Sequence, residues 1–393
     1  MLNNSPLQTY GDAALSDQNF RDLWKRVRNA EYNVGKYKNH IIGGDFTTNP
    51  WQRGTSFAAA PTASYSADRW RIDYVTSAVV TVQKTADAPS IFQTGGYFSQ
   101  HCLDIDVTTA DAAVAAGDYF TVTQRIEGLN SSHFGFGQSP GAKYVCLSFW
   151  IKTGAIGVYG VSLRNSARDR CYTGIFYVEN ADTWEYKSLN IPVDNTGTWL
   201  YTNGIGIEVS FCLMAGTTFQ RADASCNAWA ADNLFAPASQ VNALANTSYN
   251  FKLDLVQLTE AYAPVSFEYR PVQYELELCQ RYLPAWNWST VNDVIGIGYS
   301  IGTTDALIVF HSPVTPRTKP TGVTVTNATN IKLANGSNVT GAITGLTYSI
   351  GGSLSAQLIS AAHTAGSPTT AAGEGALLLG TAASQILFTG CEL

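Results

Sequence analysis

The sequence contains two matches to G-x-S-x-G, the pattern that surrounds the nucleophilic serine of many hydrolases. They are centred on Ser139 and Ser300. A nucleophile elbow requires a strand, a sharp turn and then a helix, whereas both serines are followed by strand-like sequence. Because such matches arise by chance in a chain rich in Gly and Ser, we do not expect either serine to be a nucleophile.

Paired carboxylates are the second pattern with chemical meaning, because glycoside hydrolysis needs two of them on one bond. Asp104 and Asp106 share a predicted strand face, and Asp182 and Glu185 share a predicted turn. Such pairs are also typical of solvated strand faces, which is the interpretation that we favour. The five histidines are dispersed along the chain. The sequence therefore predicts no catalytic residue, and we expect a protein that is not an enzyme.

Aromatic residues offer a better candidate site, for sugar binding. Trp286 and Trp288 are two positions apart, so in an extended strand both rings face the same way. Such rings stack against pyranose faces, and the Asn287 amide adds hydrogen bonds, so we predict a receptor-binding site here. Trp229 and Tyr201 are weaker candidates on loops. The alternative is that both tryptophans pack at a domain junction or at an oligomer axis.

Metal and cysteine chemistry have weaker signals. An aspartate such as Asp45 or Asp254 is a candidate ligand of a structural Ca²⁺, which prefers carboxylate oxygens, and no other cofactor is expected. The seven cysteines occur singly, without a C-x-x-C pair, which argues against a disulfide framework or a zinc site. We expect them to be small buried apolar residues in a protein made in a reducing cytosol.

Length and composition exclude several classes of protein. The 393 residues predict two or three domains, and the hydrophobic fraction of 45% is enough to form packed cores. Only 14% of the residues are charged, and the net charge is −6 without a basic cluster, so we expect no nucleic-acid partner. The apolar runs are short and interrupted, so no membrane insertion is expected. The first residues lack the features of a secretory signal.

Residues 1–40 differ from the rest of the chain and are predicted to form an N-terminal anchor. Within them Phe20, Leu23, Trp24 and Val27 recur at helical spacing, which predicts a short amphipathic helix. A single short helix is not stable by itself, so it must dock on another surface. Because no facing helix is predicted nearby, we expect it to dock on another protein chain.

Residues 41–270 are predicted to form an antiparallel β-sandwich, because ten candidate strands follow one another over roughly 220 residues without helical patterns between them. Alternation is clearest around residue 148, where Val145, Leu147, Phe149 and Ile151 share one face of a strand. Trp150 lies on the opposite face of this predicted strand.

Residues 271–288 are predicted to connect this domain to a second, β-sandwich-like domain at 289–393. Leu276, Leu278 and Tyr282 alternate as in a strand, whereas Leu276, Cys279 and Leu283 recur as in a helix, and flanking prolines favour the helix. Residues 285–393 hold only four acidic and three basic residues. A surface with so little charge favours burial between chains of an oligomer.

Several stretches together resemble a family of tailed-bacteriophage tail proteins. They are "NHIIGGDFTTNPWQRGTSF" with "SADRW", "LSFWIKTGAIGVYGVSLRN", "TWEYKSLNIP", "NTGTW", "FKLDLVQLTEAYAPVSFEYRPVQYELELCQRY" and "ILFTGCEL". The resemblance extends from about residue 39 to residue 393 and leaves the N-terminal 38 residues outside it. Thr259 stands where the family usually has an acidic residue, and Ala261-Tyr262 replaces a turn that usually contains Gly.

The resemblance implies a mainly β protein with a jelly roll like that of carbohydrate-binding modules, followed by a distal β domain. It also implies a homotrimeric tail fibre of a virion, assembled in the host cytoplasm and attached to the tail or to other virion proteins through residues 1–40. Host recognition would then proceed through a surface polysaccharide. One alternative is a capsid decoration or head-fibre protein without a receptor. A polysaccharide depolymerase is another, although no repeat of fixed period predicts the usual β-helix.

Physical roles for the shared residues can also be predicted. Trp51 and Trp70 are large enough to close one end of a sandwich, with Arg53 and Asp68 paired beneath them. The charges of the connecting segment, such as Arg281, would be explained if three chains meet around a fibre axis there.

Overall fold

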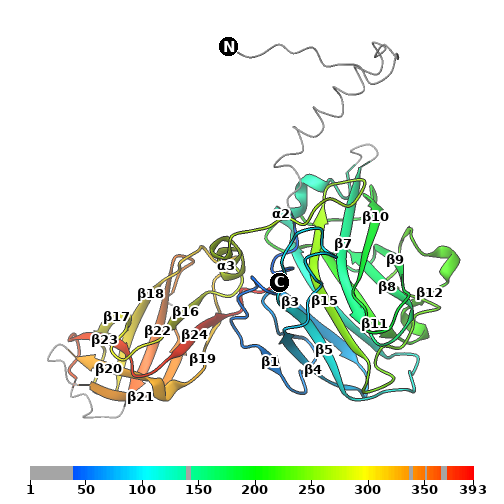
Figure 1. Cartoon of the computed structure of the whole chain (residues 1–393). Helices are drawn as coiled ribbons and strands as arrows, with labels where there is room; N and C mark the ends of the chain where they lie inside the picture. The colour runs from blue at the N-terminus through cyan, green and yellow to red at the C-terminus, as the bar shows by residue number, and fades with distance from the viewer. Residues whose placement is uncertain (1–38, 139–142, 336–339, 350–351, 364–369) are drawn as a thin grey trace, which may run out of the picture. The chain divides into compact units, whose positions relative to one another are not determined.

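The computed structural model describes residues 39–138, 143–335, 340–349, 352–363 and 370–393, all of which belong to one compact unit. The predicted helix that carries Phe20, Leu23, Trp24 and Val27 lies outside these residues. The described part of the chain is mainly β, as the sequence predicts (Figure 1).

Two antiparallel sheets form the larger part of this unit. The six-stranded sheet has the order β1 (Ser56–Phe57), β4 (Val79–Thr85), β5 (Cys102–Thr109), β15 (Asn250–Thr259), β7 (Tyr144–Thr153) and β10 (Glu185–Pro192). The seven-stranded sheet has the order β13 (Trp229–Ala230), β9 (Cys171–Val178), β8 (Gly157–Arg164), β11 (Ile205–Ala215), β6 (Tyr119–Glu127), β3 (Trp70–Val75) and β2 (Ser64–Tyr65). Each of the ten predicted strands corresponds to one of the longer strands of these sheets.

Shorter elements connect the strands of the two sheets. They are α2 (Gly128–Ser131), η1 (Ser132–Phe134), η2 (Thr217–Phe219), η3 (Asp223–Ser225) and the parallel pair β12 (Gln220–Arg221) and β14 (Ala236–Pro237). The chain crosses from one sheet to the other between β5 and β6, β6 and β7, β7 and β8, β9 and β10, and β10 and β11. Such repeated crossing is typical of a jelly-roll sandwich, so this part of the predicted fold class is confirmed.

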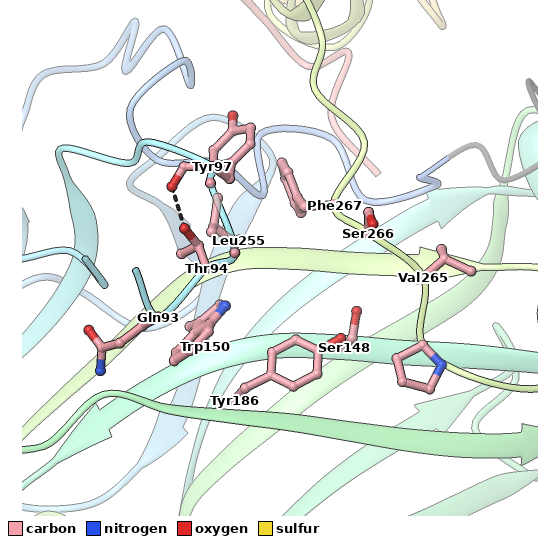
Figure 2. A pocket seen from close by; sticks show the side chains of 13 residues that line it. Gln93, Thr94, Tyr97, Ser148, Trp150, Tyr186, Leu255, Val265, Ser266 and Phe267 are labelled. Carbon is pink, nitrogen blue, oxygen red and sulfur yellow. Dashed lines mark hydrogen bonds between the residues drawn. The ribbon is translucent and has the colours of Figure 1, made fainter. Parts of the chain in front are cut away.

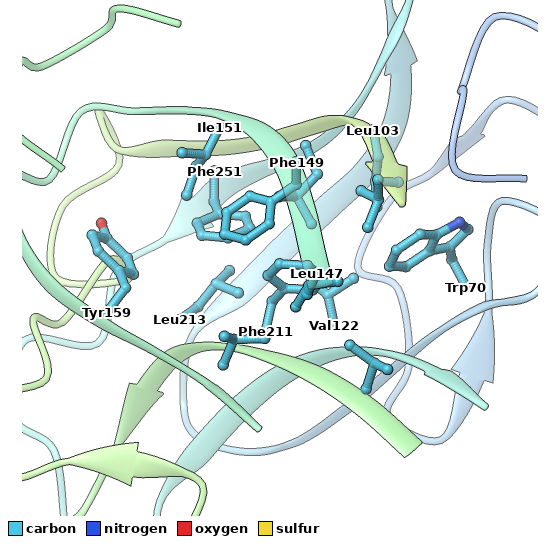
Figure 3. Close-up of a cluster of buried hydrophobic side chains, with 14 of the residues drawn as sticks. Trp70, Leu103, Val122, Leu147, Phe149, Ile151, Tyr159, Phe211, Leu213 and Phe251 are labelled. Atoms are coloured by element: carbon cyan, nitrogen blue, oxygen red, sulfur yellow. The ribbon is translucent and has the colours of Figure 1, made fainter. Parts of the chain in front are cut away.

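The apolar faces of both sheets meet in a single core (Figure 3). Phe149 of β7 contacts Phe211 of β11 edge to face, with ring centroids 4.9 Å apart, so the two sheets are joined at this point. Leu147 and Ile151 are buried beside Phe149. The predicted alternation of β7 is therefore confirmed, and Trp150 lies on the outer face of the sheet.

The "GGDF" and "DRW" stretches close one end of the sandwich. Trp70 is buried and donates its indole N–H to the Gly43 carbonyl oxygen at 2.9 Å. Gly43 has a φ of +66°, and a Cβ there would be only 2.3 Å from Asn49 Nδ2, so only glycine fits at this turn. Arg53 and Asp68 form the predicted ion pair, with 3.6 Å between Nη1 and Oδ1.

The connecting segment contains a helix, α3 (Val272–Gln280), which confirms the helical interpretation. Just beyond α3, Arg281 donates to both carboxylate oxygens of Glu127, at 2.9 and 2.6 Å, and the Tyr282 hydroxyl donates to the same group at 2.8 Å. Glu127 is completely buried on the seven-stranded sheet. The charge of Arg281 is thus matched within its own chain, so no meeting of three chains is needed to explain it.

The C-terminal part differs from the predicted sandwich. Six strands form a closed barrel: β17 (Val294–Ser300), β18 (Asp305–His311), β22 (Ala356–His363), β21 (Thr340–Tyr348), β20 (Ile331–Asn335) and β23 (Gly375–Gly380). The C-terminal part also contains a three-stranded sheet, in the order β16 (Ala285–Trp288), β24 (Ser384–Thr389) and β19 (Gly322–Val325), and a short helix η4 (Ala328–Asn330). The prediction of a second sandwich is therefore wrong, because alternation within strands does not reveal whether a sheet closes on itself.

All seven cysteines lie in the described residues, where each is buried and unpaired. This confirms their predicted role as small core residues. No helix of the described residues has the length and apolar character needed to cross a membrane.

Candidate functional site

A groove lies on the outer face of the six-stranded sheet, and two aromatic rings form its floor. Trp150 of β7 and Tyr186 of β10 are cross-strand neighbours, and their ring centroids are 5.5 Å apart (Figure 2). Tyr186 is 43% exposed and Trp150 is partly buried. Both rings project away from the core because successive side chains of a strand point to opposite faces. Ser148 lies two positions before Trp150 on the same face.

The first wall of the groove is the turn Gln93–Tyr97 in the connection between β4 and β5. The Thr94 hydroxyl donates to the Tyr97 carbonyl oxygen, and Gly95 and Gly96 provide the positive φ angles of the turn. The Tyr97 hydroxyl donates to Asp45 Oδ2 at 2.7 Å. These contacts hold the wall in place by tying it to the end of the sandwich.

The second wall is the segment Pro264–Phe267, which follows β15. The Gln257 amide donates to the carbonyl oxygens of Val265 and Ser266, at 3.3 Å in each case, and so fixes this segment to the sheet. The Phe267 ring contacts the Tyr97 ring edge to face, with centroids 5.1 Å apart. The two walls therefore meet at one end of the groove, as Figure 2 shows.

The volume of the groove is about 600 Å³, and none of the described residues that line it carries a charge. Gln93, Thr94, Ser148 and Ser266 contribute neutral hydrogen-bonding groups, while the rings supply flat apolar surface. Such a lining suits a neutral, amphipathic ligand, one with flat apolar faces and hydroxyl edges. The lining contains neither a carboxylate nor a histidine that would act as an acid or base at this position.

A second cavity, of about 230 Å³, lies on the same face of the sheet and is lined by charged residues. Lys152 lies two positions after Trp150 on β7. Asp87 Oδ2 forms ion pairs with Lys152 Nζ, at 3.0 Å, and with Lys252 Nζ, at 2.6 Å. Asp182 also lines the cavity. The outer face of the sheet thus changes from neutral to charged along β7.

The structure does not place the two predicted receptor-binding tryptophans on an exposed surface. Trp288 is buried, and Trp286 contacts Phe310 and Phe388 with ring centroids 5.5 and 5.0 Å apart. Asn287 is exposed on the opposite side of β16. This burial contradicts a role for Trp288 as an exposed stacking ring. The two tryptophans pack in the core of the C-terminal part, which is neither the predicted domain junction nor an oligomer axis.

Trp229 and Tyr201 belong to another aromatic cluster. The Trp229 indole N–H donates to the Pro192 carbonyl oxygen at 2.6 Å, and its ring contacts Phe136 and Trp199. The Tyr201 hydroxyl donates to the Phe136 carbonyl oxygen. Both side chains are therefore held by packing contacts, and neither lines the groove.

One carboxylate of each pair that the sequence suggested, Asp104 and Glu185, has local partners. Asp104 is buried beside Gln83 and Lys252, and burial raises its pKa to about 6 even though the Lys252 ammonium opposes the shift. Glu185 accepts backbone N–H groups of Glu179 and Asn180. Of the two predicted serine motifs, Ser139 lies outside the described residues, while Ser300 is buried at the end of β17 and is followed by a strand.

The two candidate calcium ligands lie close together at the end of the sandwich. Asp254 is completely buried, and its Oδ2 has no hydrogen-bond partner among the described residues. Burial raises the pKa of Asp254 well above its usual value, and the nearby Asp45 adds to this shift. No group of three or more His, Cys, Asp or Glu side chains in the described ranges has the arrangement of a metal site. Ca²⁺ binding by Asp45 or Asp254 stays a prediction.

Sequence reasoning missed the residues that form the groove. The sequence nevertheless contained a signal for one of these residues, because the alternation of β7 already placed Trp150 on the face opposite to the core. Tyr186 and the two walls could not be assigned in the same way, because they come from segments far apart in the chain.

Comparisons with known proteins found no matching family model and no matching curated protein. Among solved structures, the enzymatically active domain of tailspike protein 4 from bacteriophage CBA120 aligns at 11% identity with a TM-score of 0.29, over 56% of this chain and 21% of that chain. A family 11 carbohydrate-binding module from Clostridium thermocellum, solved with a β-1,3-1,4-mixed-linked tetrasaccharide, aligns at 11% identity with a TM-score of 0.26, over 53% and 98%.

A family 22 carbohydrate-binding module from the same organism aligns at 16% identity with a TM-score of 0.27, over 54% of this chain and 97% of that chain. Similarity at these TM-scores is too low to support an argument about function. Function is therefore inferred from the residues of this chain.

Proposed function

We propose that this chain is a structural subunit of a bacteriophage virion, a trimeric tail fibre that binds a neutral host-surface glycan in the groove over β7 and β10. The observation that carries the binding proposal is the Trp150–Tyr186 pair on the floor of an uncharged groove of about 600 Å³. Ring faces of this kind stack on the apolar faces of sugars, and the neutral polar groups of the walls match sugar hydroxyls.

The virion part of the proposal is supported by the resemblance of residues 39–393 to phage tail proteins. The sparse charge of residues 285–393 supports a surface covered by identical chains. Three copies of a weak sugar site on one rigid assembly would act together, because each further binding event becomes intramolecular.

Replacing Tyr186 or Trp150 with alanine is expected to weaken glycan binding by at least tenfold, or about 1.4 kcal/mol. Each change removes one of the two stacking faces. Binding of neutral oligosaccharides and of purified host polysaccharide would be measured by calorimetry. Tyr177→Ala is a matched control, because Tyr177 is 50% exposed on β9 of the other sheet.

Equal binding by Tyr186→Ala and Tyr177→Ala would show that the groove is not the glycan site. Release of reducing ends from the host polysaccharide would instead indicate a depolymerase. If the purified protein does not adsorb to host cells, a decoration protein without a receptor would replace the proposed fibre.

The proposed assembly gives a second expected result. The full chain should have a native mass three times its 42.3 kDa, and native mass spectrometry measures this directly. A version lacking residues 1–40 should also form trimers if the β domains make the contacts between chains. A stable monomer in both cases would contradict the trimer.

A further inference from the structure

A cluster of arginines lies on the outer face of the seven-stranded sheet, on the side of the sandwich opposite to the groove. Glu208 of β11 is the cross-strand neighbour of both Arg125 on β6 and Arg164 on β8. Arg168, which follows β8, reaches the same carboxylate. Three guanidinium groups therefore share one buried carboxylate.

The contacts around Glu208 are short and well formed. Its oxygens accept from Arg164 Nη2 at 2.5 Å, from Arg125 Nε at 2.8 Å and from Arg168 Nε at 3.1 Å. Burial alone would raise the pKa of Glu208, but Arg164, Arg168 and Arg125 together outweigh it and lower the pKa to about 2. Glu208 is thus an anion at neutral pH, and it balances one of the three cations. The Asp73 carboxylate, which forms an ion pair with Arg71, also acts on Arg168.

A cavity of about 240 Å³ opens beside this cluster. Arg164 and Arg168 form its basic side, and an aromatic side consists of Tyr119, Phe219 and Phe235. Their rings contact one another, with centroids 5.0 Å apart for Tyr119 and Phe219 and 4.9 Å apart for Phe219 and Phe235. The cavity therefore offers positive charge on one side and flat apolar surface on the other.

The remaining polar groups of the cavity already have partners. Asp73 accepts two hydrogen bonds from Arg71 Nε, at 3.0 and 2.8 Å, and Asn233 Oδ1 accepts from Arg164 Nη1 at 2.9 Å. In contrast, Arg164 Nε is buried and has no hydrogen-bond partner among the described residues. A buried guanidinium donor without an acceptor is costly, although the Arg164 guanidinium also lies over the Phe235 ring, 5.2 Å from its centroid. Arg168, whose side chain is 42% exposed, is the guanidinium that an anionic ligand can reach.

We propose that this cavity is a second binding site, for a sugar residue that carries a carboxylate. The carboxylate would bind at Arg164 and Arg168, and the apolar face of the sugar ring would lie against Phe219 and its neighbours. Guanidinium groups bind carboxylates through charge-assisted hydrogen bonds, and the aromatic side distinguishes a sugar acid from a bare anion. The proposal does not depend on the neutral groove over β7 and β10.

Titration of the full chain with glucuronate, glucose and inorganic phosphate, followed by calorimetry or by ligand-observed NMR, tests this site. Glucuronate is expected to bind at least tenfold more tightly than glucose, and its binding should weaken as salt is added. Arg168→Gln is expected to reduce glucuronate binding at least tenfold. Arg168 is partly exposed, and Arg125 and Arg164 remain to neutralise Glu208, so this variant should fold.

Matched variants separate the parts of the proposal. Lys143→Gln removes a surface cation elsewhere and should leave binding unchanged. Phe219→Ala should weaken glucuronate binding but not phosphate binding, and Trp150→Ala should affect neither. Equal binding of glucose and glucuronate by Trp150→Ala, which has lost one stacking ring of the neutral groove, or no effect of Arg168→Gln, would overturn the site. Phosphate binding as tight as glucuronate binding, with no effect of Phe219→Ala, would overturn its assignment to a sugar acid.

Discussion

Replacing Glu208 with glutamine is expected to lower the free energy of unfolding by about 3–5 kcal/mol. The side chain keeps its size but loses the charge that holds Arg125, Arg164 and Arg168 together, which leaves partly buried guanidinium groups without compensation. Equilibrium unfolding in urea at neutral pH measures the loss. The expected effect is large because Glu208 is only 1% exposed.

The contribution of Glu208 to the free energy of unfolding should depend on pH. The pKa of Glu208 is about 2 in the folded chain, below the ordinary value of 4.5, so its stabilising effect is present above about pH 5 and is lost as the pH falls towards 2. The difference in unfolding free energy between the wild type and Glu208→Gln should therefore shrink over this range. Glu260→Gln is the control, because the exposed pair of Glu260 with Lys143 contributes less than about 1 kcal/mol. A difference that does not change with pH would contradict the proposed role.

Replacing Glu392 with alanine is the second change with a large expected effect, a loss of about 3–5 kcal/mol in the free energy of unfolding. Glu392 forms ion pairs with Arg53, at 3.1 Å, and with Arg69, which is buried at the end of the sandwich. The Arg69 guanidinium also lies over the Tyr282 ring, 3.6 Å from its centroid. Without Glu392, the partners of this buried cation among the described residues would be the Tyr282 ring and the Arg125 carbonyl oxygen.

Thermal and urea unfolding of Glu392→Ala would measure this loss. Glu374→Ala is a suitable control, since Glu374 is exposed and accepts the local backbone N–H of Ala371 at 3.1 Å. Replacing Arg69 together with Glu392 by apolar residues should recover much of the stability, because the buried guanidinium is then removed along with its partner, while Arg53 keeps its pair with Asp68. Equal stability of Glu392→Ala and the wild type would show that the ion pair with Arg69 is not needed.

The groove and the arginine cavity lie on opposite outer faces of one sandwich, and they differ in charge. The groove lining is uncharged, whereas the cavity is lined by Arg164 and Arg168. A polysaccharide with both neutral and acidic sugars would fit both faces. The variants Tyr186→Ala and Arg168→Gln, measured on the same polysaccharide, therefore report on the two faces separately.

The sequence by itself determined the features that depend on neighbouring residues. Period-two alternation identified the strands and placed Trp150 on the face opposite to Phe149. The flanking prolines Pro271 and Pro284 favoured the helix α3, whereas the apolar spacing left helix and strand open. Seven cysteines that occur singly, without a C-x-x-C pair, predicted buried free thiols. These features follow from local geometry, because the direction of a side chain on a strand or helix is fixed by its immediate backbone.

Only the tertiary structure decided which distant residues meet. Tyr97 and Phe267 close the groove although 170 residues separate them in the chain, and Arg281 pairs with Glu127 across 154 positions. Closure of the C-terminal strands into a barrel, with Trp286 and Trp288 packed inward, likewise depends on strand pairing that no local pattern specifies. Alternation indicates which side of a strand is apolar. The order of the strands, the paths of the loops and the ion pairs between strands depend on the whole chain.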